Sequence, residues 1–344
     1  MKKFFAIGLM LAGSTAFGTT ARYNALQRAS HIQDVSTVFT QGISVPTGMM
    51  VLPELMSLNF GMTTPTPAVG DAAEGGMIRN TGDSRIGFFV GVEDAARSTG
   101  YLGIENPFSV AYGAKAGDMP WAIVFSYANS SKKATAATFD DQTQSFMRLD
   151  GSVVVGDLTV GANLGLTNKA KGDGTSDTAE NSQAPMTVFG YYAMGDLTAY
   201  GTYMMNTTKD NPAGTETKTE DSKLVVGAVN TMKKEGADFF YEVAYSIKTS
   251  KTGAVKSTET RLPVLIGVEA DAASWLTLRG SVKQNVLLGD NKVDETESTR
   301  HDTTVAAGAG LKFNKATLDF TLSAANTGNL NSALGAQAGL TYLF

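Results

Sequence analysis

Eleven charged residues recur at alternate positions of short, β-like stretches, where they could line a path for ions. Seven are basic and four are acidic: Arg85, Arg148, Asp150, Glu242, Lys248, Arg261, Glu269, Arg279, Lys283, Lys312 and Asp319. Successive side chains of a strand point to opposite faces, so these residues share a face with Gly, Ser, Thr and Ala. Charged side chains on a wet inner wall bias the choice of ions, and the basic surplus favours anions. The alternative interpretation is that these side chains form ladders of charged residues and salt bridges, which fill a lumen that conducts no ions.

Catalytic and metal-binding chemistry has little support in the sequence. There are two histidines. His301 stands beside Arg300 and Asp302, near Glu297, and a His–carboxylate dyad could serve proteolysis or lipolysis. A histidine in a polar loop is usually solvated and inert, and His31 lies in the segment before the main domain. The Asp-rich loops lack regular calcium-ligand spacing, and the absence of Cys excludes disulfides and zinc–thiolate sites. We therefore predict no enzyme activity, no cofactor and no metal.

Bulk composition limits the class of protein. Of the 344 residues, 42% are hydrophobic and 18% are charged, against about 25% charged in ordinary soluble domains. Mean hydropathy is only -0.07, and after residue 20 there is no uncharged apolar run of the roughly 18 residues that a spanning helix needs. A β-barrel escapes such a scan because only every second residue faces lipid. The net charge of -5 gives no basic surplus for binding nucleic acid.

The first 18 residues have the pattern of a secretory signal peptide. Lys2 and Lys3 precede a short apolar stretch, Phe4–Ala12, and Ala16-Phe17-Gly18 provides small residues for cleavage. Cleavage after Ala21 is the alternative. The apolar stretch is about nine residues long, which is too short to cross a membrane. We expect an exported chain.

Residues 19–54 differ from the rest of the chain. Apolar residues at three- to four-residue spacing predict a short amphipathic helix within Tyr23–Phe39. Gly42, Pro46, Gly48 and Pro53 then interrupt the pattern. We interpret 19–54 as a periplasmic or luminal segment that precedes the main domain, and the alternative is a disordered N-terminus.

From Leu55 onward, alternating stretches are joined by short and long connections in turn. Four short ones carry Gly-Asp, at 82–83, 117–118, 156–157 and 195–196, and the last three are spaced by 39 residues. Gly at the first central position suits a type II′ hairpin turn. The long connections are polar: Asn168–Gln183, Thr207–Asp221, Thr249–Thr258 and Leu288–His301. Short turns at one end and long loops at the other are typical of outer-membrane barrels.

The alternation predicts sixteen strands in one antiparallel, up-and-down transmembrane β-barrel over residues 55–344. They span 55–62, 75–81, 84–92, 107–115, 120–129, 143–155, 158–168, 184–194, 197–207, 222–232, 238–249, 258–270, 275–287, 302–313, 317–326 and 333–344. Fourteen strands is the alternative, if 55–81 is not part of the wall. A propeller is disfavoured because each repeat of about 40 residues holds two strands rather than four.

One face of the predicted strands carries the large apolar residues. Examples are Ile86, Phe88, Val90 and Val92; Trp121, Ile123, Phe125 and Tyr127; Phe239, Tyr241, Val243, Tyr245 and Ile247; Leu262, Val264, Ile266 and Val268; and Leu318, Phe320 and Leu322. We expect this face to contact lipid. Trp121, Trp275 and Phe313, with Tyr342 and Phe344, would form an aromatic girdle at the end with the short turns. By the alternation of its strand, Trp275 would point into the barrel unless a β-bulge changes the face on which its side chain lies.

In the last eight residues, 337–344, alternate positions carry the larger apolar side chains, and the last residue is an aromatic one. This stretch resembles the C-terminal assembly signal of bacterial outer-membrane barrels, and the matching positions are Gln337, Gly339, Tyr342 and Phe344. The resemblance implies that the barrel assembly machinery and outer-membrane lipid are partners.

Further stretches carry a family resemblance. The N-terminal sequence resembles that of the major outer-membrane proteins of Bdellovibrio-type predatory bacteria. The matching stretches are Asn24-Ala25-Leu26, His31–Phe39, Pro53-Glu54-Leu55 and Asn80–Phe89. The N-terminal sequence is also distantly similar to the long-chain fatty-acid transporter family, but Thr40-Gln41-Gly42-Ile43 stands where that family has Asn-Pro-Ala. The resemblance implies a porin-like barrel and names no substrate.

These patterns together predict a porin-like channel of a Gram-negative outer membrane for the passive diffusion of small hydrophilic solutes and ions. One alternative is a hydrophobic-solute transporter with residues 19–54 as a hatch. Another is a structural or surface-recognition barrel that conducts nothing. The sequence leaves open whether the protein forms a homo-oligomer.

Overall fold

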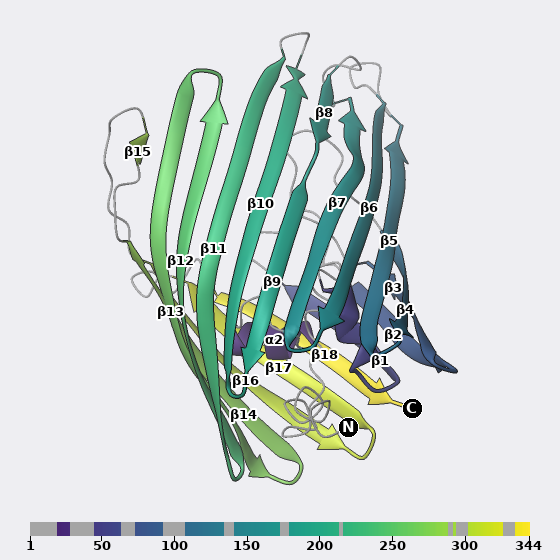
Figure 1. The fold of residues 1–344 in the computed structure, drawn as a ribbon, viewed down its shortest axis with the longest axis vertical. Helices are drawn as coiled ribbons and strands as arrows, with labels where there is room; N and C mark the ends of the chain where they lie inside the picture. The colour runs from purple at the N-terminus through teal and green to yellow at the C-terminus, as the bar shows by residue number, and fades with distance from the viewer. Residues whose placement is uncertain are drawn as a thin grey trace.

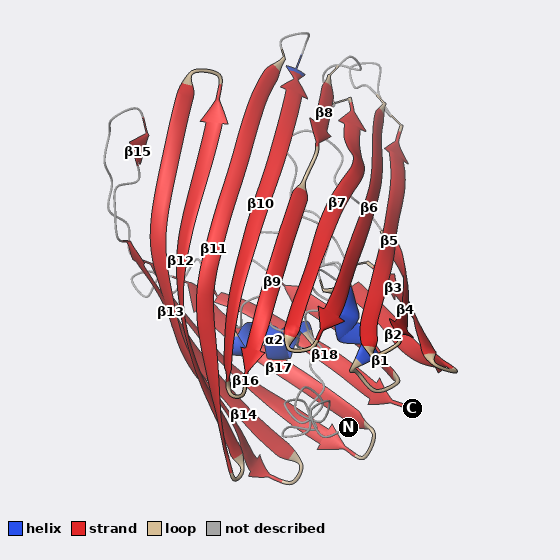
Figure 2. Cartoon of the chain, in the orientation of Figure 1, coloured by secondary structure: helices blue, strands red, loops and turns tan. Residues whose placement is uncertain are grey.

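In the computed structural model, the described part of the chain is a barrel of antiparallel strands with two short helical segments inside it (Figure 1, Figure 2). The described residues are 19–27, 45–62, 73–91, 107–133, 141–172, 179–212, 216–287, 292–293, 302–325 and 334–344. The predicted signal peptide, His31, Val92 and His301 lie outside these ranges.

The helical segments are α2 (Thr20–Leu26) and the 3-10 helix η1 (Pro46–Met50). The strands are β1 (Leu55–Met62), β2 (Ala73–Thr81), β3 (Ser84–Val90), β4 (Phe108–Ala116), β5 (Met119–Lys132), β6 (Gln142–Val155), β7 (Leu158–Lys171), β8 (Glu180–Gln183), β9 (Met186–Met194), β10 (Leu197–Asn211), β11 (Thr217–Lys234), β12 (Ala237–Thr252), β13 (Val255–Ala273), β14 (Leu276–Leu287), β15 (Lys292–Val293), β16 (Asp302–Phe313), β17 (Ala316–Ala325) and β18 (Leu334–Leu343).

The sheet is closed, because β1 pairs antiparallel with both β2 and β18. Residue pairs at this seam run from Leu55 opposite Leu343 to Met62 opposite Ala336. Closure satisfies the backbone N–H and C=O groups of the first and last strands, which an open sheet would leave unpaired in lipid.

Within the described residues, the wall has sixteen strands, as the sequence predicts. The sheet contains 18 strand segments, but β8 and β9 both lie between β7 and β10 and are two parts of one wall strand. Ala184 and Pro185 separate them, and proline has no N–H for the ladder. The two-residue β15 is not a wall strand. It pairs with β13, whereas the neighbouring wall strands β14 and β16 pair directly with each other. The alternative of fourteen strands is wrong, because β1 and β2 form part of the wall.

Three of the predicted polar loops are shorter than expected, because the strands extend into them. β11 has 18 residues and β13 has 19, and pairing continues to Asp210 opposite Thr217 and to Thr252 opposite Val255. β7 and β8 likewise take both ends of Asn168–Gln183. Polar side chains join the two extended hairpins, as where the hydroxyls of Thr219 on β11 and Thr252 on β12 lie 2.8 Å apart. Apolar alternation therefore underestimates the lengths of these strands, because backbone pairing continues beyond the last apolar residue.

The short turns have the predicted chemistry. Gly82, Gly117, Gly156 and Gly195 have φ between 61° and 66°, and Thr81 pairs with Ser84 across the first of these turns. Among the described residues other than glycine, only Gln27 and Asn314 have positive φ, so the aspartates do not, as expected for type II′ rather than type I′ turns. All these turns lie at one end of the barrel, which we call the turn end, and the long hairpins lie at the opposite hairpin end (Figure 1).

The outer face is apolar, as predicted. Ile86, Phe88 and Val90 are exposed while Phe89 between them is buried, and the same alternation recurs on the other described strands, with exposed Ile123, Phe125, Phe239, Tyr241, Val243, Ile266, Phe320 and Leu322. Large apolar residues outside and small or polar residues inside is the reverse of a soluble sandwich, and it suits a lipid-facing wall. None of the helices in the described ranges has the length and hydropathy needed to cross a bilayer.

The aromatic residues that we expect in a girdle lie close to the turn end. The Trp121 ring lies 5.7 Å from that of Tyr112, and Phe313 is 58% exposed. Trp275, which is 54% exposed, lies in the turn between β13 and β14 rather than in a strand. The register shift between Asp271 and Ala273 lies in β13, before the turn, and it does not change the parity of β14. The girdle role of Trp275 therefore stays a prediction.

The end of β18 is tied to the start of β1 on the outer face. The Phe344 N–H donates to the carbonyl of Glu54 at 3.2 Å, and the Arg79 guanidinium lies 4.5 Å from the centre of the Phe344 ring. Tyr342 meets the same ring edge-on, with centroids 5.8 Å apart. These contacts brace the seam that closes the barrel.

Replacing Phe344 with alanine should therefore reduce the amount of assembled barrel severalfold, since it removes both ring contacts at the seam. Assembly is measured as the fraction of protein whose gel migration changes on heating. Phe313→Ala, which truncates an exposed aromatic side chain away from the seam, is the matched control. Equal assembly of the two variants would contradict a special role for Phe344.

Candidate functional site in the barrel lumen

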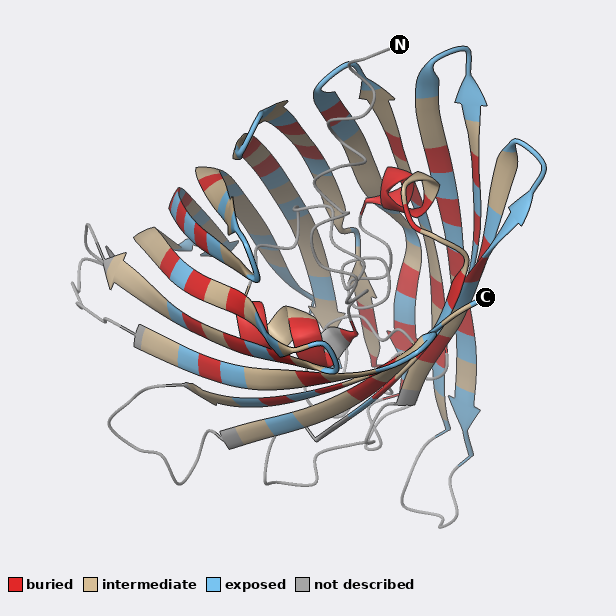
Figure 3. Cartoon of the chain, turned by 90° about the horizontal axis from the view of Figure 1, so that it is seen from below, coloured by how far each residue is buried: buried red, intermediate tan, exposed pale blue. Residues whose placement is uncertain are grey.

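The candidate site is the inner wall together with the segment that lies against it. Both α2 and η1 lie inside the ring of strands (Figure 3). We call the described residues 19–27 and 45–54 the luminal segment. It contacts wall residues close to the turns, so it occupies the turn end of the lumen.

The helix α2 begins at Thr20 because Thr19 caps it. The Thr19 hydroxyl accepts a hydrogen bond from the Arg22 N–H at 3.3 Å, which satisfies one of the donors that a helix start leaves unpaired. The helix ends at Gln27, whose φ of 48° is left-handed. It therefore starts three residues before the predicted start at Tyr23, which was placed from apolar spacing without the cap. The rest of the predicted helix, from residue 28 on, lies outside the described residues.

An ion-pair network joins α2 to the wall. Arg22 makes a two-pronged contact with Glu269, with Nε–Oε2 at 2.8 Å and Nη2–Oε1 at 3.0 Å. Arg279 bridges Glu269 at 2.5 Å and Asp319 at 2.6 Å. Thr19 donates to the second Asp319 oxygen at 3.0 Å. The side chains of Arg279 and Asp319 are fully buried, and those of Arg22 and Glu269 are 8% and 5% exposed.

The network is electrically neutral only when Arg22 is included. The wall alone contributes two carboxylates and one guanidinium. A buried charge without a partner is costly, and removing one partner of such a set typically destabilises by about 3–5 kcal/mol. Strand parity predicts the inward position of Glu269, Arg279 and Asp319, but it says nothing about Arg22, which lies outside the strands.

Further hydrogen bonds and a close backbone approach hold α2 in place. Ser281 donates to the Ala25 carbonyl at 2.7 Å and accepts from Gln27 at 3.2 Å. Thr321 donates to the carbonyl of Ala21. At Gly308, a Cβ atom would lie 2.7 Å from the Ala25 Cβ, so a side chain there would displace the helix.

The parity of β18 brings two residues of the predicted assembly signal into this contact. Gln337 accepts a hydrogen bond from Asn24, and Gly339 faces Thr19 so closely that no side chain would fit. Tyr342 and Phe344 are exposed on the outer face. The assembly role of these residues stays a prediction, and the inward pair has a second task in docking the luminal segment.

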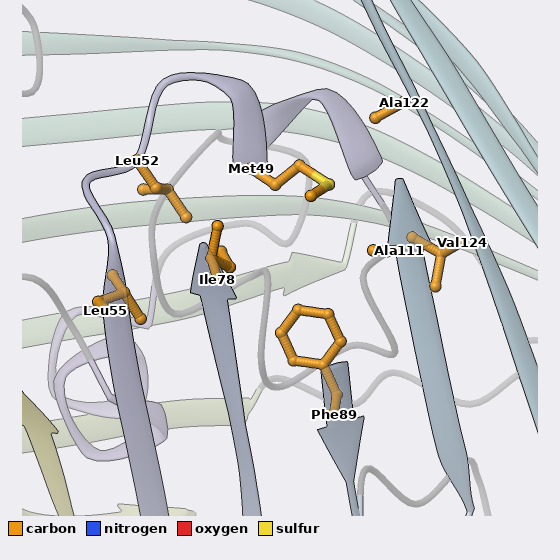
Figure 4. Packing of buried hydrophobic residues seen from close by; sticks show 8 residues of the cluster. All are labelled: Met49, Leu52, Leu55, Ile78, Phe89, Ala111, Ala122 and Val124. Atoms are coloured by element: carbon orange, nitrogen blue, oxygen red, sulfur yellow. The ribbon is translucent and has the colours of Figure 1, made fainter. Parts of the chain in front are cut away.

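The second helical segment, η1, lies on an apolar part of the inner wall. Figure 4 shows its Met49, and Leu52 after it, beside inward-facing apolar residues: Leu55, Ile78, Phe89, Ala111, Ala122 and Val124. Ser152 accepts from the Thr47 N–H at 2.8 Å and donates to its hydroxyl at 2.9 Å. Arg85 donates to the Met49 carbonyl at 2.7 Å. The expectation of a small or polar inner face fails here because η1 shields these residues from water.

The remaining charged residues predicted to line a pore fall into separate groups. Arg148 pairs with Asp150 at 2.9 Å, and Asn163 donates to Asp150 at 2.7 Å. Tyr200 donates to Glu242. Lys312 lies 2.8 Å from Asp271 near the turn end. The other three, Lys248, Arg261 and Lys283, lie on neighbouring strands further from the turns, and Arg261 pairs with Glu259.

An apolar patch lies on the inner wall beside η1. Val45 packs with Phe189, Tyr191, Tyr200 and Ala244. The rings of Phe189 and Tyr191 stack, with centroids 5.5 Å apart and planes 13° from parallel. Strand parity places these rings inside, since Tyr191 shares its face of β9 with buried Phe189 and Tyr200 shares its face of β10 with buried Thr202, but the sequence predicts no role for the patch.

Comparison with known proteins identifies the fold and not the family. No protein-family profile matches the chain, and no curated protein matches it. A bacterial polysaccharide outer membrane secretin aligns over 85% of this chain and 98% of its own, with a TM-score of 0.51 and 10% identity. A porin aligns over 85% and 99%, with a TM-score of 0.43 and 14% identity. A loop-deletion form of OmpT, an outer membrane protein of Vibrio cholerae, aligns over 85% and 97%, with a TM-score of 0.43 and 12% identity.

These likenesses are fold-level. The chain has the fold of bacterial outer-membrane β-barrels, as the structure also shows. The resemblance to Bdellovibrio-type outer-membrane proteins and to fatty-acid transporters stays a hypothesis.

Replacing Arg22 with alanine should destabilise the barrel by about 3–5 kcal/mol, because Glu269 then keeps a buried charge with one partner fewer. The free energy of unfolding in urea, measured in detergent micelles, checks this value. Lys209→Ala is the control, since Lys209 pairs with Glu216 at 3.5 Å on the exposed surface of the hairpin end, where an ion pair contributes about 0–1 kcal/mol. Equal effects of the two substitutions would show that Arg22 does not anchor the segment.

Proposed function

We propose that the protein is a porin-like channel of a Gram-negative outer membrane, through which small hydrophilic solutes and ions diffuse passively. One observation carries the proposal: a closed barrel of sixteen strands with an apolar outer wall and a polar, charged inner wall. A barrel of this size is wide enough to enclose water. Charges on the inner wall are then hydrated and can act on passing ions, whereas on the outer wall they would be costly in lipid.

In this proposal the turn end faces the periplasm and the hairpin end faces outward. A strand needs about 9–11 residues to cross the membrane, while β11 and β13 have 18 and 19. Their outer parts, with exposed Lys218 and Glu220 paired at 2.5 Å, would project into water. Short periplasmic turns and longer outer connections are usual for such barrels.

The luminal segment narrows the periplasmic end of the proposed path. The ion-pair network there carries no net charge, because Arg22 neutralises the set formed by Glu269, Arg279 and Asp319. Any charge preference of the channel would then come from wall residues further from the turns.

A hydrophobic-solute transporter is the second candidate, and the apolar patch around Val45 favours it. In that case the luminal segment would be a hatch, and an apolar solute would rest against Phe189 and Tyr191 before passing. A fluorescent long-chain fatty acid distinguishes the candidates: saturable binding that Tyr191→Ser weakens supports the transporter, and no binding supports the porin-like channel.

Purified protein in planar lipid bilayers should show ohmic openings. Hydrated ions in a water-filled lumen give a current proportional to voltage. A preparation that migrates as a heat-modifiable barrel but never conducts would refute the channel and leave the structural or surface-recognition role.

Deleting residues 19–50 should increase the conductance of each opening, because the luminal segment would no longer occupy the turn end. Single-channel recording compares the deletion with the intact chain. The Phe313→Ala variant, changed outside the lumen, should conduct as the intact chain does. Unchanged conductance after the deletion would mean that the segment does not obstruct the path.

A further inference from the structure

Four basic side chains gather on the inner wall beyond the luminal segment, one on each of four consecutive strands. They are Lys223 on β11, Lys248 on β12, Arg261 on β13 and Lys283 on β14. We propose that this cationic cluster binds small solutes that carry phosphate or carboxylate groups and makes the lumen selective for anions. The proposal deepens the proposed function and rests on it, because it names the class of solute.

Strand parity places all four side chains on the inner wall. Lys248 shares its face of β12 with buried Glu242, Ala244 and Ser246, and Lys283 shares its face of β14 with buried Thr277, Arg279 and Ser281. Arg261 has the parity of buried Leu265 and Glu269. On β11 the neighbouring Leu224 and Val226 are exposed on the outer face, which leaves Lys223 inside.

The cluster brings like charges together. Lys223 lies directly opposite Lys248 in the β11–β12 register. Lys223 also interacts electrostatically with Lys283 and Arg261, so the three strands beyond β11 all contribute to its surroundings. Like charges placed opposite each other destabilise a strand pair. An anion shared among these groups would relieve that repulsion.

The rest of the lumen is arranged differently. Near the turn end, each buried guanidinium meets carboxylates: Arg22 meets Glu269, Arg279 meets Glu269 and Asp319, and Arg148 meets Asp150. In the cluster, the described acidic residues on the same face are Glu259, which pairs with Arg261 and lies directly opposite Lys248, and Asp221, two positions before Lys223 on β11. Glu242, six positions before Lys248 on β12, accepts a hydrogen bond from Tyr200. The four positive groups leave a surplus of one positive charge even when Glu242 is counted with the other two carboxylates.

The groups present suit oxyanions. A guanidinium recognises carboxylate and phosphate oxygens with paired donors, and lysine ammonium groups add mobile point charges. Lys248 is exposed and the other three are half-buried, so an anion in the lumen can reach them. A site of exposed and half-buried groups also releases its ion, which passage through a channel requires.

The sequence predicts that three of the four cluster residues line the pore: Lys248, Arg261 and Lys283. It does not predict Lys223, because the following Leu224-Val225-Val226 places apolar residues on both faces of β11 and obscures the parity of this strand. The register with Lys248 resolves it.

The double variant Lys223→Gln/Lys248→Gln tests the proposal. The matched control is Lys251→Gln/Lys256→Gln, which removes the same charge from a second pair of directly opposed lysines in the β12–β13 hairpin. Both control residues are exposed near the tip of that hairpin, where water and salt screen their repulsion. Heat-modifiable migration confirms that each variant forms the barrel.

Two readouts are needed. Reversal potentials in planar bilayers under a potassium phosphate gradient report charge selectivity, and calorimetric titration of the detergent-solubilised barrel with inorganic phosphate and with acetate reports binding without any need for conduction. We expect the intact chain and the control to prefer anions. The cluster variant should lose that preference and about tenfold in phosphate affinity, as expected when charge-assisted contacts are removed.

The outcomes separate the two proposals. Phosphate or acetate binding that depends on the cluster, in a barrel that never conducts, supports the anion site and refutes the channel. Conduction with the same reversal potential and the same affinities in the intact chain and the cluster variant refutes the anion site and leaves the channel intact. An equal loss in the control variant would also refute it, because the effect would then follow net charge rather than the cluster.

Discussion

The contact of Arg22 with Glu269 is the interaction on which the arrangement of the turn end depends. Glu269 lies between two guanidiniums, one from the luminal segment and one from the wall, at 2.8 Å and 2.5 Å. Without Arg22 the buried wall residues Glu269, Arg279 and Asp319 would carry an unbalanced negative charge, which is costly away from water. The wall is therefore complementary to the segment. Ser281 adds a hydrogen bond, and Gly308 and Gly339 allow a close approach because they have no side chain.

This internal contact is possible because the sheet closes on itself. The pairing of β1 with β18 satisfies the backbone of both strands and leaves side chains free to specialise by face. The outer face is apolar along the wall and polar only where the long hairpins extend. At the turn end, the inner face carries an apolar bed under η1 on β1–β5 and a neutral ion-pair network around α2 on β13, β14 and β17. The cationic cluster lies further from the turns. Only this cluster has charge left over for a solute, which is why the proposed selectivity is placed there.

The wall was predictable from the sequence to a large extent, and the lumen much less so. Period-two alternation and the Gly-Asp turns are local signals, so the sixteen strands and their faces follow from them. The extended hairpins β10–β11 and β12–β13 were underestimated, because their outer parts are polar on both faces and carry no such signal. Arg22, Thr19 and η1 could not be placed, since their partners are up to 300 residues away in the chain. Phe89 shows the same limit: its inward position follows from parity, but its apolar surroundings exist only because η1 covers them.

Hydrogen exchange at residues 19–27 in the assembled barrel tests most directly whether the luminal segment is docked on the wall. The account predicts slow exchange for the amides of Arg22 and Tyr23, which donate to Thr19 at 3.3 Å and 3.1 Å, with protection lost in an Arg22→Ala variant while the strands stay protected. Exchange at the rate of an unstructured peptide in the intact chain would contradict it.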